Sequence, residues 1–475
     1  MPGPGRQSGA CRIGHGLTNR NNRIMNQLQK NNFTEGKILG PLLRFAAPVL
    51  GARILQSLYG AVDLMVVGKY AETADVSAVA SGTQIMNTVT GIIMGICMGI
   101  TVLIGQSIGA GRSSESGRII AAGIKLFAAF GAVLCAAIVL LRAQICALLH
   151  CPPEAFSRSM AYIGICGAGI YFIIFYNVLG SVFRGMGDSK TPLLSVAIAC
   201  GLNIAGDIVF VRYLGLGASG AALATVMSQG VSVIVCAAII MKRGLPFEFG
   251  RKSFRDTGVL TRNILEIGVP VALQDFVVGL SFLILTSITN NIGLIESAGV
   301  GVAEKVCSFV MLVPSAFSQA VTAFVAQNIG AGKRDRASLA LRYSISVSLC
   351  IGVVISWYSF FRGYELTGIF SSDAAVVAAG WDYLKAYAID VLLTSFLFCF
   401  LGYFNGCGYT RMTMLQGIGS AFLIRVPISY IMSRQIPVSL FRIGLATPCA
   451  SAAQILVCFW YYHRKNKEAR RAGAL

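Results

Sequence analysis

The chain has 475 residues, of which 55% are hydrophobic and only 12% are charged, and it carries a formal net charge of +19. Soluble domains contain roughly 25% charged residues, so this composition, with a mean hydropathy of +0.70, excludes an ordinary soluble protein. Lys and Arg lie between the apolar runs instead of forming a patch, which argues against a nucleic-acid partner.

Residues 1–40 are polar and rich in Gly, Asn and Arg, and we expect a mobile cytoplasmic segment there, starting at Met1 or Met25. After this segment come twelve apolar runs, each long enough to cross a bilayer as a helix. The sequence thus predicts an all-α integral membrane protein. The expected transmembrane helices are 42–67, 77–105, 118–142, 159–186, 191–213, 219–241, 264–289, 297–327, 338–361, 377–404, 412–434 and 443–462.

The basic residues indicate how these helices are oriented. An even number of spans places both termini on one side of the membrane, and the segments on that side hold most of the Lys and Arg outside the spans. Such segments are cytoplasmic by the positive-inside rule. We therefore expect a multi-pass protein of the plasma (cell) membrane with both termini in the cytoplasm. The three His residues lie outside the spans, which excludes a His-built metal site in the membrane.

The chain contains an internal repeat. SIGAGR at 107–112 and NIGAGK at 328–333 are 221 positions apart, and FRGMG at 183–187 and FNGCG at 404–408 keep the same offset. Each repeat holds six spans, so both insert with the same orientation, which predicts two six-helix lobes related by a pseudo-two-fold axis along the membrane normal.

The repeat also predicts the domain boundaries. The expected parts are an N-lobe at 41–241, a cytoplasmic linker at 242–263, a C-lobe at 264–462 and a cytoplasmic basic tail at 463–475.

Polar side chains in the outer half of the first repeat form the candidate ion site. An ionisable side chain inside a membrane is costly and usually functional. Asp63 and Asp207 fall at similar depth, and span direction brings four further polar residues toward them. These are Tyr162, Asn177, Asn203 and Thr225. Such an oxygen-rich set suits Na⁺ or a proton shared between carboxylates. If the ion is Na⁺, we expect Asp63, Asn203 and Asp207 to bind it.

The second repeat lacks this set, because Ser429 or Tyr430 stands near the Asp207 position and Arg425 near the Asn203 position. We therefore expect one lobe to couple to the ion and both lobes to line the substrate path. The candidates for the substrate cavity are Gln56, Tyr59, Gln274, Asp275 and Asp390. Of these, Asp275 could bind a cationic substrate.

Several motifs together resemble the multidrug and toxic compound extrusion (MATE) family of cation-coupled exporters. They are AAPVLGARILQSLYGAVDLMVVG at 46–68, GQSIGAGR at 105–112, FRGMGDSKTP at 183–192, NIAGDIVF at 203–210, GLGASGAALATVMSQ at 215–229, GVPVALQ at 268–274 and AQNIGAGK at 326–333.

The resemblance implies two lobes forming a V around a central cavity, and it assigns the ion site to the six N-lobe residues named above. Some family members also carry a coupling Glu in the seventh span, where this chain has Val278. Asp390 in the tenth span is then the C-lobe candidate.

The expected function is secondary active export, as a monomer, of amphipathic and often cationic drugs in exchange for H⁺ or Na⁺. No Walker A motif is present, so we expect no ATP and no cofactor besides the coupling ion. A flippase for a lipid-linked precursor, with its strongly cationic cavity, is the alternative. An enzyme is disfavoured, since only the two aspartates suggest a catalytic pair. Gly60 and Gly68 on the first span, and Gly201 and Gly206 on the fifth, favour these two spans as the moving parts.

Overall fold

The computed structural model describes residues 33–471, and within this range the chain folds into helices joined by turns, with no strand. The N-lobe helices are α2 Leu39–Tyr70, α3 Thr73–Gly109, α4 Ser113–Leu140, α5 Arg142–Leu148, α6 Pro153–Ala168, α7 Ile170–Gly185, α8 Lys190–Asp207, η1 Ile208–Tyr213 and α9 Gly217–Arg243. After a connection that contains η2 Arg251–Phe254, the C-lobe helices are α10 Gly258–Asn290, α11 Leu294–Val310, α12 Leu312–Gly330, α13 Arg334–Gly368, α14 Ala374–Gly406, α15 Thr410–Ser420, η3 Ala421–Arg425, α16 Val426–Ser433, α17 Leu440–Gly444 and α18 Ala446–Arg471.

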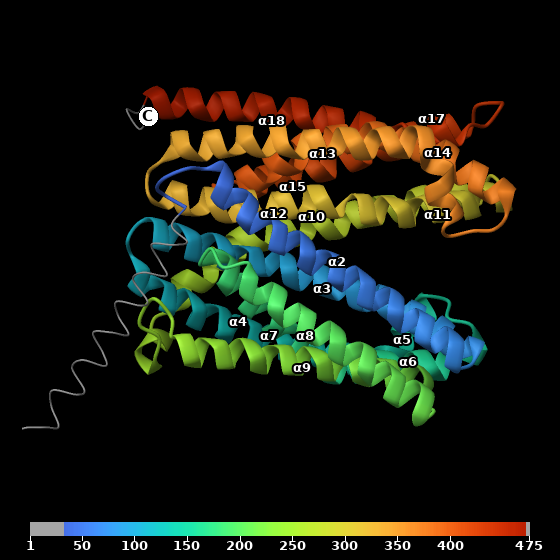
Figure 1. Cartoon of the computed structure of the whole chain (residues 1–475), viewed down its shortest axis with the longest axis horizontal. Coiled ribbons are helices and arrows are strands. Elements are labelled where there is room, and N and C mark those ends of the chain that lie inside the picture. Colours follow the sequence, from blue (N-terminus) through green and yellow to red (C-terminus); the bar gives the residue numbers. More distant parts are fainter. Residues whose placement is uncertain (1–32, 472–475) are drawn as a thin grey trace, which may run out of the picture.

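Eleven helical stretches in the described residues are long and apolar enough to cross a membrane, and the pair α6–α7, bent by 50°, makes a twelfth. Each coincides with one of the twelve predicted spans. The all-α prediction with twelve spans is therefore confirmed. The two lobes lie close together at the end where the C-terminus emerges and diverge toward the opposite end (Figure 1).

Several spans are interrupted in ways that hydropathy does not reveal. The fourth breaks at Gly169 and the eighth at Met311, while the fifth and eleventh contain the π-helical turns η1 and η3. The two π turns lie in equivalent spans but not at equivalent positions, since η1 follows Asp207 whereas η3 ends at Arg425, near the counterpart of Asn203. Because π turns interrupt the regular helical hydrogen bonds and are frequent at functional sites, they mark both spans as candidates for local bending.

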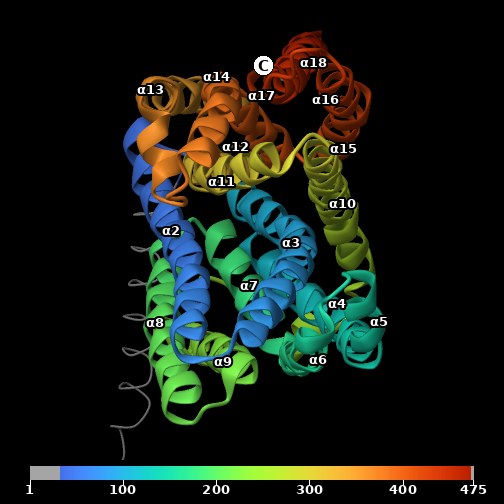
Figure 2. The ribbon, with the colours of Figure 1, turned by 90° about the vertical axis from the view of Figure 1, so that its right-hand side faces the viewer.

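The first helix of each lobe packs partly on the other lobe. The first part of α2 lies against α12 and α13, whereas the start of α10 joins the N-lobe core through Leu260, Ile264 and Ala272. Figure 2 shows α2 and α10 running along opposite sides of the molecule, each passing from one lobe to the other. This reciprocal exchange follows the pseudo-two-fold symmetry, and it makes these two helices the links through which one lobe can act on the other.

The prediction of a mobile segment at 1–40 is wrong for its last residues, because the chain is packed against the C-lobe from Phe33 onward. Phe33 is buried and stacks near Phe324 with ring centroids 5.0 Å apart, and Arg336 donates hydrogen bonds to the carbonyls of Phe33, Glu35 and Gly36. This polypeptide therefore anchors α2 to the C-lobe. Residues 1–32 lie outside the described part. The predicted tail at 463–475 likewise continues α18 as helix up to Arg471.

The repeated GAG turns meet between the lobes, at the end of the molecule where the C-terminus emerges and α3 crosses α12. A Cβ at Gly109 would lie 1.9 Å from the carbonyl oxygen of Gln327, and a Cβ at Gly330 would lie 2.1 Å from that of Gln106. The side-chain amides of two glutamines add a matching pair of hydrogen bonds. Gln106 donates to the Gly406 carbonyl at 3.1 Å, and Gln327 donates to the Gly185 carbonyl at 3.0 Å. All these partners are related by the repeat offset.

Substitution of either crossing glycine tests this contact. We expect Gly109→Ala and Gly330→Ala each to destabilise the protein by about 1–3 kcal/mol, because a methyl group cannot fit without moving the helices apart. Gly279→Ala is the matched control, since a Cβ there meets nothing within 4 Å. Thermal unfolding in detergent measures the effect. Equal melting temperatures for all three variants would show that the crossing is not tightly packed.

Candidate ion-binding site

Two buried carboxyl groups face each other near the C-terminal ends of α2 and α8. Asp63 lies seven residues before the end of α2, and Asp207 is the last residue of α8, where the π turn η1 begins. Their side chains are 4% and 0% exposed, and the two carboxyl groups adjoin. The sequence placed both aspartates at one depth, and the structure brings them together.

Asn203 and Thr225 complete the cluster. Asn203 lies one helical turn before Asp207 on α8, and its Nδ2 donates to Thr225 Oγ1 at 3.4 Å. The Thr225 hydroxyl in turn donates to Asp63 Oδ2, also at 3.4 Å. Three helices, α2, α8 and α9, therefore contribute to one group of oxygen atoms.

Most oxygens of this cluster lack a hydrogen-bond donor. Asp63 Oδ1, Asn203 Oδ1 and both carboxyl oxygens of Asp207 are buried, and no described residue donates to them. Leaving buried polar atoms unpaired is costly, and two adjacent carboxylates repel each other. A proton or a small cation would remove both costs. Oxygen atoms from carboxylate and amide groups are suitable ligands for Na⁺ as a hard cation.

Tyr162 borders this cluster, but its hydroxyl bonds elsewhere. The phenol shares a 3.2 Å hydrogen bond with Thr83 of α3, a residue that sequence reasoning missed because a lone Thr in an apolar run carries no signal. The ring lies against the backbone of α3, where a Cβ at Gly82 would be 2.2 Å from it. Tyr162 thus forms a wall of the site and fixes α6 to α3.

Asn177 lies apart from the cluster, contrary to the prediction of one common pocket. It is on α7, beyond the 50° bend that separates α7 from the α6 helix carrying Tyr162. Its Nδ2 donates to the Ile173 carbonyl within its own helix, and its side chain lines a different cavity. The break at Gly169, which spacing along an ideal helix does not predict, changes the face on which Asn177 lies.

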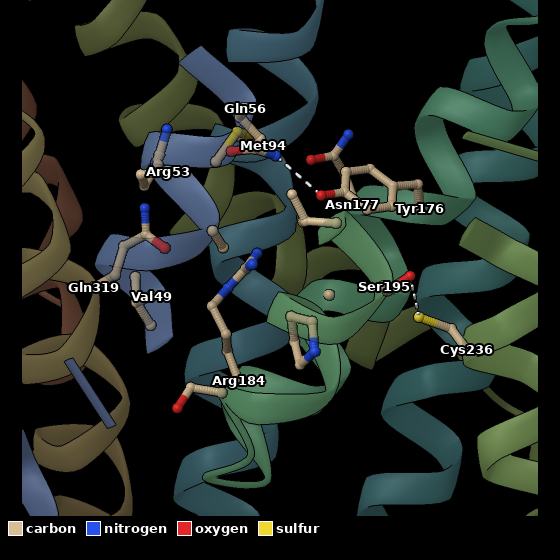
Figure 3. Close-up of a pocket in the computed structure, with 15 residues that line it drawn as sticks. Val49, Arg53, Gln56, Met94, Tyr176, Asn177, Arg184, Ser195, Cys236 and Gln319 are labelled. Atoms are coloured by element: carbon tan, nitrogen blue, oxygen red, sulfur yellow. Dashed lines mark hydrogen bonds between the residues drawn. The ribbon is translucent and has the colours of Figure 1, made fainter. Parts of the chain in front are cut away.

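That second cavity, the central pocket, is small and partly open to solvent, and it lies closer than the ion cluster to the end of α2 at which that helix begins. Figure 3 shows side chains from α2, α7, α8 and α12 around it. Its lining residues are Val49, Ala52, Arg53, Gln56, Met94, Tyr176, Asn177, Gly180, Arg184, Ser189, Pro192, Ser195, Val196, Cys236 and Gln319.

Of the five predicted cavity residues, the lining of the central pocket includes Gln56, which donates to the Tyr176 hydroxyl at 3.0 Å. Tyr59, Gln274 and Asp275 are outside that lining. Asp275 is exposed on α10, where it remains a candidate for contact with a substrate between the lobes.

Asp390 is also outside the lining of the central pocket; it is 2% exposed and lies within the C-lobe near Arg425. Arg425 donates to Ser281 of α10 at 3.0 Å and covers the Phe282 ring at 4.3 Å. The C-lobe therefore holds a fixed cation close to its buried carboxyl group, whereas the N-lobe cluster has none. This difference in charge favours the N-lobe cluster, although in the C-lobe Asp390 Oδ1 and Glu304 Oε1 are also buried without a donor among the described residues.

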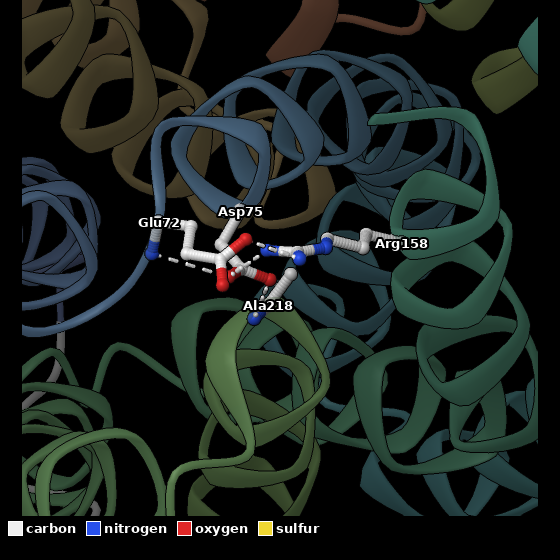
Figure 4. A network of polar contacts seen from close by, with 4 residues as sticks. All are labelled: Glu72, Asp75, Arg158 and Ala218. Carbon is white, nitrogen blue, oxygen red and sulfur yellow. Dashed lines mark hydrogen bonds and ion pairs between the residues drawn. The ribbon is translucent and has the colours of Figure 1, made fainter. Parts of the chain in front are cut away.

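A salt bridge network at the outer surface ties together the helices behind the N-lobe cluster (Figure 4). Arg158 of α6 pairs with Glu72 at 2.5 Å and with Asp75 of α3. Asp75 also accepts from the backbone N–H of Ala218 at the start of α9, at 3.0 Å. The network holds α3, α6 and α9 together, while Asp63 and Asp207 belong to α2 and α8, which are outside it.

Comparison with known proteins identifies the family. The sequence model of the MatE family matches residues 48–209 and 270–431, one match in each repeat. The chain belongs to the MatE family. The resemblance noted in the sequence, to the multidrug and toxic compound extrusion transporters, is thereby confirmed.

Relatives of this MATE transporter align along most of its length. The probable multidrug resistance protein YoeA of Bacillus subtilis is 26% identical, over 88% of this chain and 92% of its own. The multidrug export protein MepA of Staphylococcus aureus is 23% identical, over 90% and 94%. Among solved structures, a MATE protein in complex with MaL6 has a TM-score of 0.87 at 19% identity, over 93% of this chain and 99% of that one. An outward-facing multidrug resistance MATE transporter gives 0.86 at 20% identity, over 91% and 97%. These structures establish the fold.

The outer network can be tested by removing its arginine. We expect Arg158→Gln to lower stability by about 1–3 kcal/mol, because Asp75 would lose its charged partner while its side chain is only 11% exposed. Arg362→Gln is the control, since the Arg362–Glu365 pair is 62% and 51% exposed and such pairs contribute at most about 1 kcal/mol. Thermal unfolding of both variants gives the comparison. Equal losses would contradict a stabilising role specific to the outer network.

Proposed function

We propose that this MATE transporter is a secondary active exporter that exchanges H⁺ or Na⁺ for amphipathic organic compounds by alternating access. The observation that carries this proposal is the cluster of Asp63, Asn203 and Asp207, whose buried oxygens have no donor among the described residues. The multidrug resistance and export functions named for YoeA and MepA support the choice of substrate. Export of organic cations, a monomeric state, and a plasma-membrane location with cytoplasmic termini belong to the same proposal.

The positions of the two sites suggest how ion and substrate are coupled. Gln56 of the central pocket and Asp63 of the ion cluster are seven residues apart on α2, about 10 Å along the helix and on one face. Ser195 and Asn203 have a similar relation on α8, which packs against α2. An ion that offsets the repulsion between Asp63 and Asp207 would draw α2 toward α8. Because the same helices line the central pocket, that movement would narrow the pocket and favour substrate release.

Helix packing suggests that α2 and η1 can bend. A Cβ at Gly60 or Gly201 would meet nothing within 4 Å, whereas one at Gly206 would lie 3.0 Å from Ala224. Gly206 thus serves close packing of α8 on α9, and the bend in this span belongs to the π turn that follows Asp207. The outer network of Arg158 would meanwhile hold α3, α6 and α9 in place.

Neutralising the carboxyl groups tests the ion site. We expect Asp63→Asn and Asp207→Asn each to reduce gradient-driven efflux to the level of protein-free liposomes, because an amide cannot change charge. Thr225→Ala should lower the apparent ion affinity only about 3- to 10-fold, since it removes one hydrogen bond. The assay is efflux of rhodamine 123 and of fluorescein from liposomes with an imposed pH or Na⁺ gradient.

Asp335→Asn is the control for this assay, because Asp335 is exposed in the first turn of α13. Wild-type efflux rates in both Asp63→Asn and Asp207→Asn would exclude the cluster as the coupling site. Failure of the wild-type protein to move either dye under any gradient would overturn the proposed function itself.

Linkage between ion and substrate provides a second test. If occupation of the ion cluster narrows the central pocket, the bound ion must weaken the binding of a dye in that pocket. The bound dye must in turn weaken the binding of the ion by the same factor. We expect a 5- to 150-fold change in affinity, the usual range of such couplings, when dye binding is titrated across pH and Na⁺ concentration. An affinity that stays constant from pH 5 to pH 8 and from zero to high Na⁺ would rule out this scheme.

A further inference from the structure

The central pocket contains two arginines whose charge is not balanced. Arg53 enters it from α2 and Arg184 from α7, and the lining includes no Asp, Glu or Lys. Among the ion pairs of residues 33–471, none includes either arginine. Figure 3 shows both side chains at the pocket, with Gln319 of α12 beside Arg53.

The bonds that these arginines make are to neutral groups. Arg184 donates to the Ser181 hydroxyl at 2.7 Å. The Gln319 amide, in the orientation that satisfies both groups, accepts from Arg53 Nε at 3.1 Å. An arginine has five N–H donors, so both guanidinium groups keep donors that these contacts leave unused. The surrounding side chains supply polar atoms but no negative charge.

The nearby carboxylates do not neutralise the pocket. Asp188 precedes the pocket residue Ser189, but its oxygens accept from the backbone of Lys190 and Thr191 and from the Thr191 hydroxyl. Asp275, on α10 of the other lobe, faces Arg53 without forming an ion pair. Neither carboxylate lines the pocket or pairs with Arg184, so an anion bound between Arg53 and Arg184 would balance positive charge that the lining leaves unpaired.

We propose that the central pocket binds an anionic group, a carboxylate, sulfonate or phosphate carried by an amphipathic compound. This inference rests on the proposed function, and it names the charge of the substrate in this pocket. Guanidinium groups bind such anions with paired hydrogen bonds, and Val49, Ala52, Met94, Pro192 and Val196 provide an apolar wall for the rest of the molecule. Organic cations, if exported, bind elsewhere between the lobes, for example at Asp275.

The central pocket combines residues of both lobes, so the binding of a substrate there would depend on how the lobes are arranged. Arg53 is on α2, and its partner Gln319 belongs to the C-lobe helix α12, while Arg184 is near the cytoplasmic end of α7. A bound anion would bridge the N-lobe to the helix that forms the cytoplasmic crossing. Movement of α2 relative to α12 would break this bridge and release the anion.

Two dyes with the same xanthene ring system and opposite charge provide the test. With wild-type protein in nanodiscs of zwitterionic lipid, we expect anionic fluorescein to bind in the absence of Na⁺ at pH 8. Arg53→Gln and Arg184→Gln should each weaken its binding about 10-fold or more, because a hydrogen bond to a charged group is lost. Binding of cationic rhodamine 123 should stay within about twofold or become tighter, since the variants remove positive charge.

Further variants separate charge from folding. Arg53→Lys and Arg184→Lys keep the charge and should weaken fluorescein binding less than the Gln variants do. Arg112→Gln, at a 69% exposed cytoplasmic side chain, should change nothing. Absence of fluorescein binding to the wild-type protein would overturn the proposal, as would equal weakening of both dyes or unchanged fluorescein binding in both Gln variants.

A competition experiment distinguishes a soluble anion from a lipid head group. If polyprenyl phosphate in the nanodisc displaces fluorescein and neutral polyprenol does not, the anion is carried by a lipid, as the flippase alternative requires. If neither displaces it, the ligand is a soluble organic anion. The efflux assay separates the two proposals: gradient-driven export of rhodamine 123 without fluorescein binding would refute the anion site alone, whereas arginine-dependent fluorescein binding without export of either dye would refute the exporter alone.

Discussion

The crossing of α3 over α12 is the contact on which the rest of the molecule depends. Gly109 and Gly330 let the two backbones touch, and Gln106 and Gln327 each bind a carbonyl at the end of a helix in the opposite lobe. Both pairs lie at the end of the molecule where the C-terminus emerges, so the lobes are held together there and diverge toward the opposite end (Figure 1). Because the contact is made by matching residues of two repeats, opening it would expose equivalent surfaces on both lobes.

The two lobes share a backbone plan but differ in buried charge, and this difference assigns their roles. The N-lobe places Asp63 beside Asp207, and no cation of the described residues pairs with either, so a bound proton or Na⁺ would offset their repulsion. The C-lobe places Arg425 near Asp390 and therefore supplies its own positive charge. The charge of the N-lobe cluster would then change when an ion binds, whereas the buried charge of the C-lobe would stay fixed. The helices α2 and α10 connect the two lobes.

The sequence predicted the twelve spans, the repeat and the meeting of Asp63 with Asp207, because hydropathy, offset and depth along a helix are local or additive properties. It did not predict the separation of Asn177 from Tyr162, which depends on a 50° bend at Gly169. Thr83 carries no signal in the sequence. The unbalanced charge of Arg53 and Arg184 was equally invisible, since composition counts charges over the whole membrane and only packing shows which of them have partners.

Hydrogen exchange of the unmodified protein in nanodiscs tests whether the proposed alternating access changes both sides of the reciprocal crossing of α3 and α12. The relevant backbone is the last turn of α3, around Gln106, and the last turn of α12, around Gln327. The account predicts that both segments change protection together, in the same direction, when bound ion is replaced by bound substrate. A change in one segment without the other, or constant protection of both in a protein that transports, would contradict it.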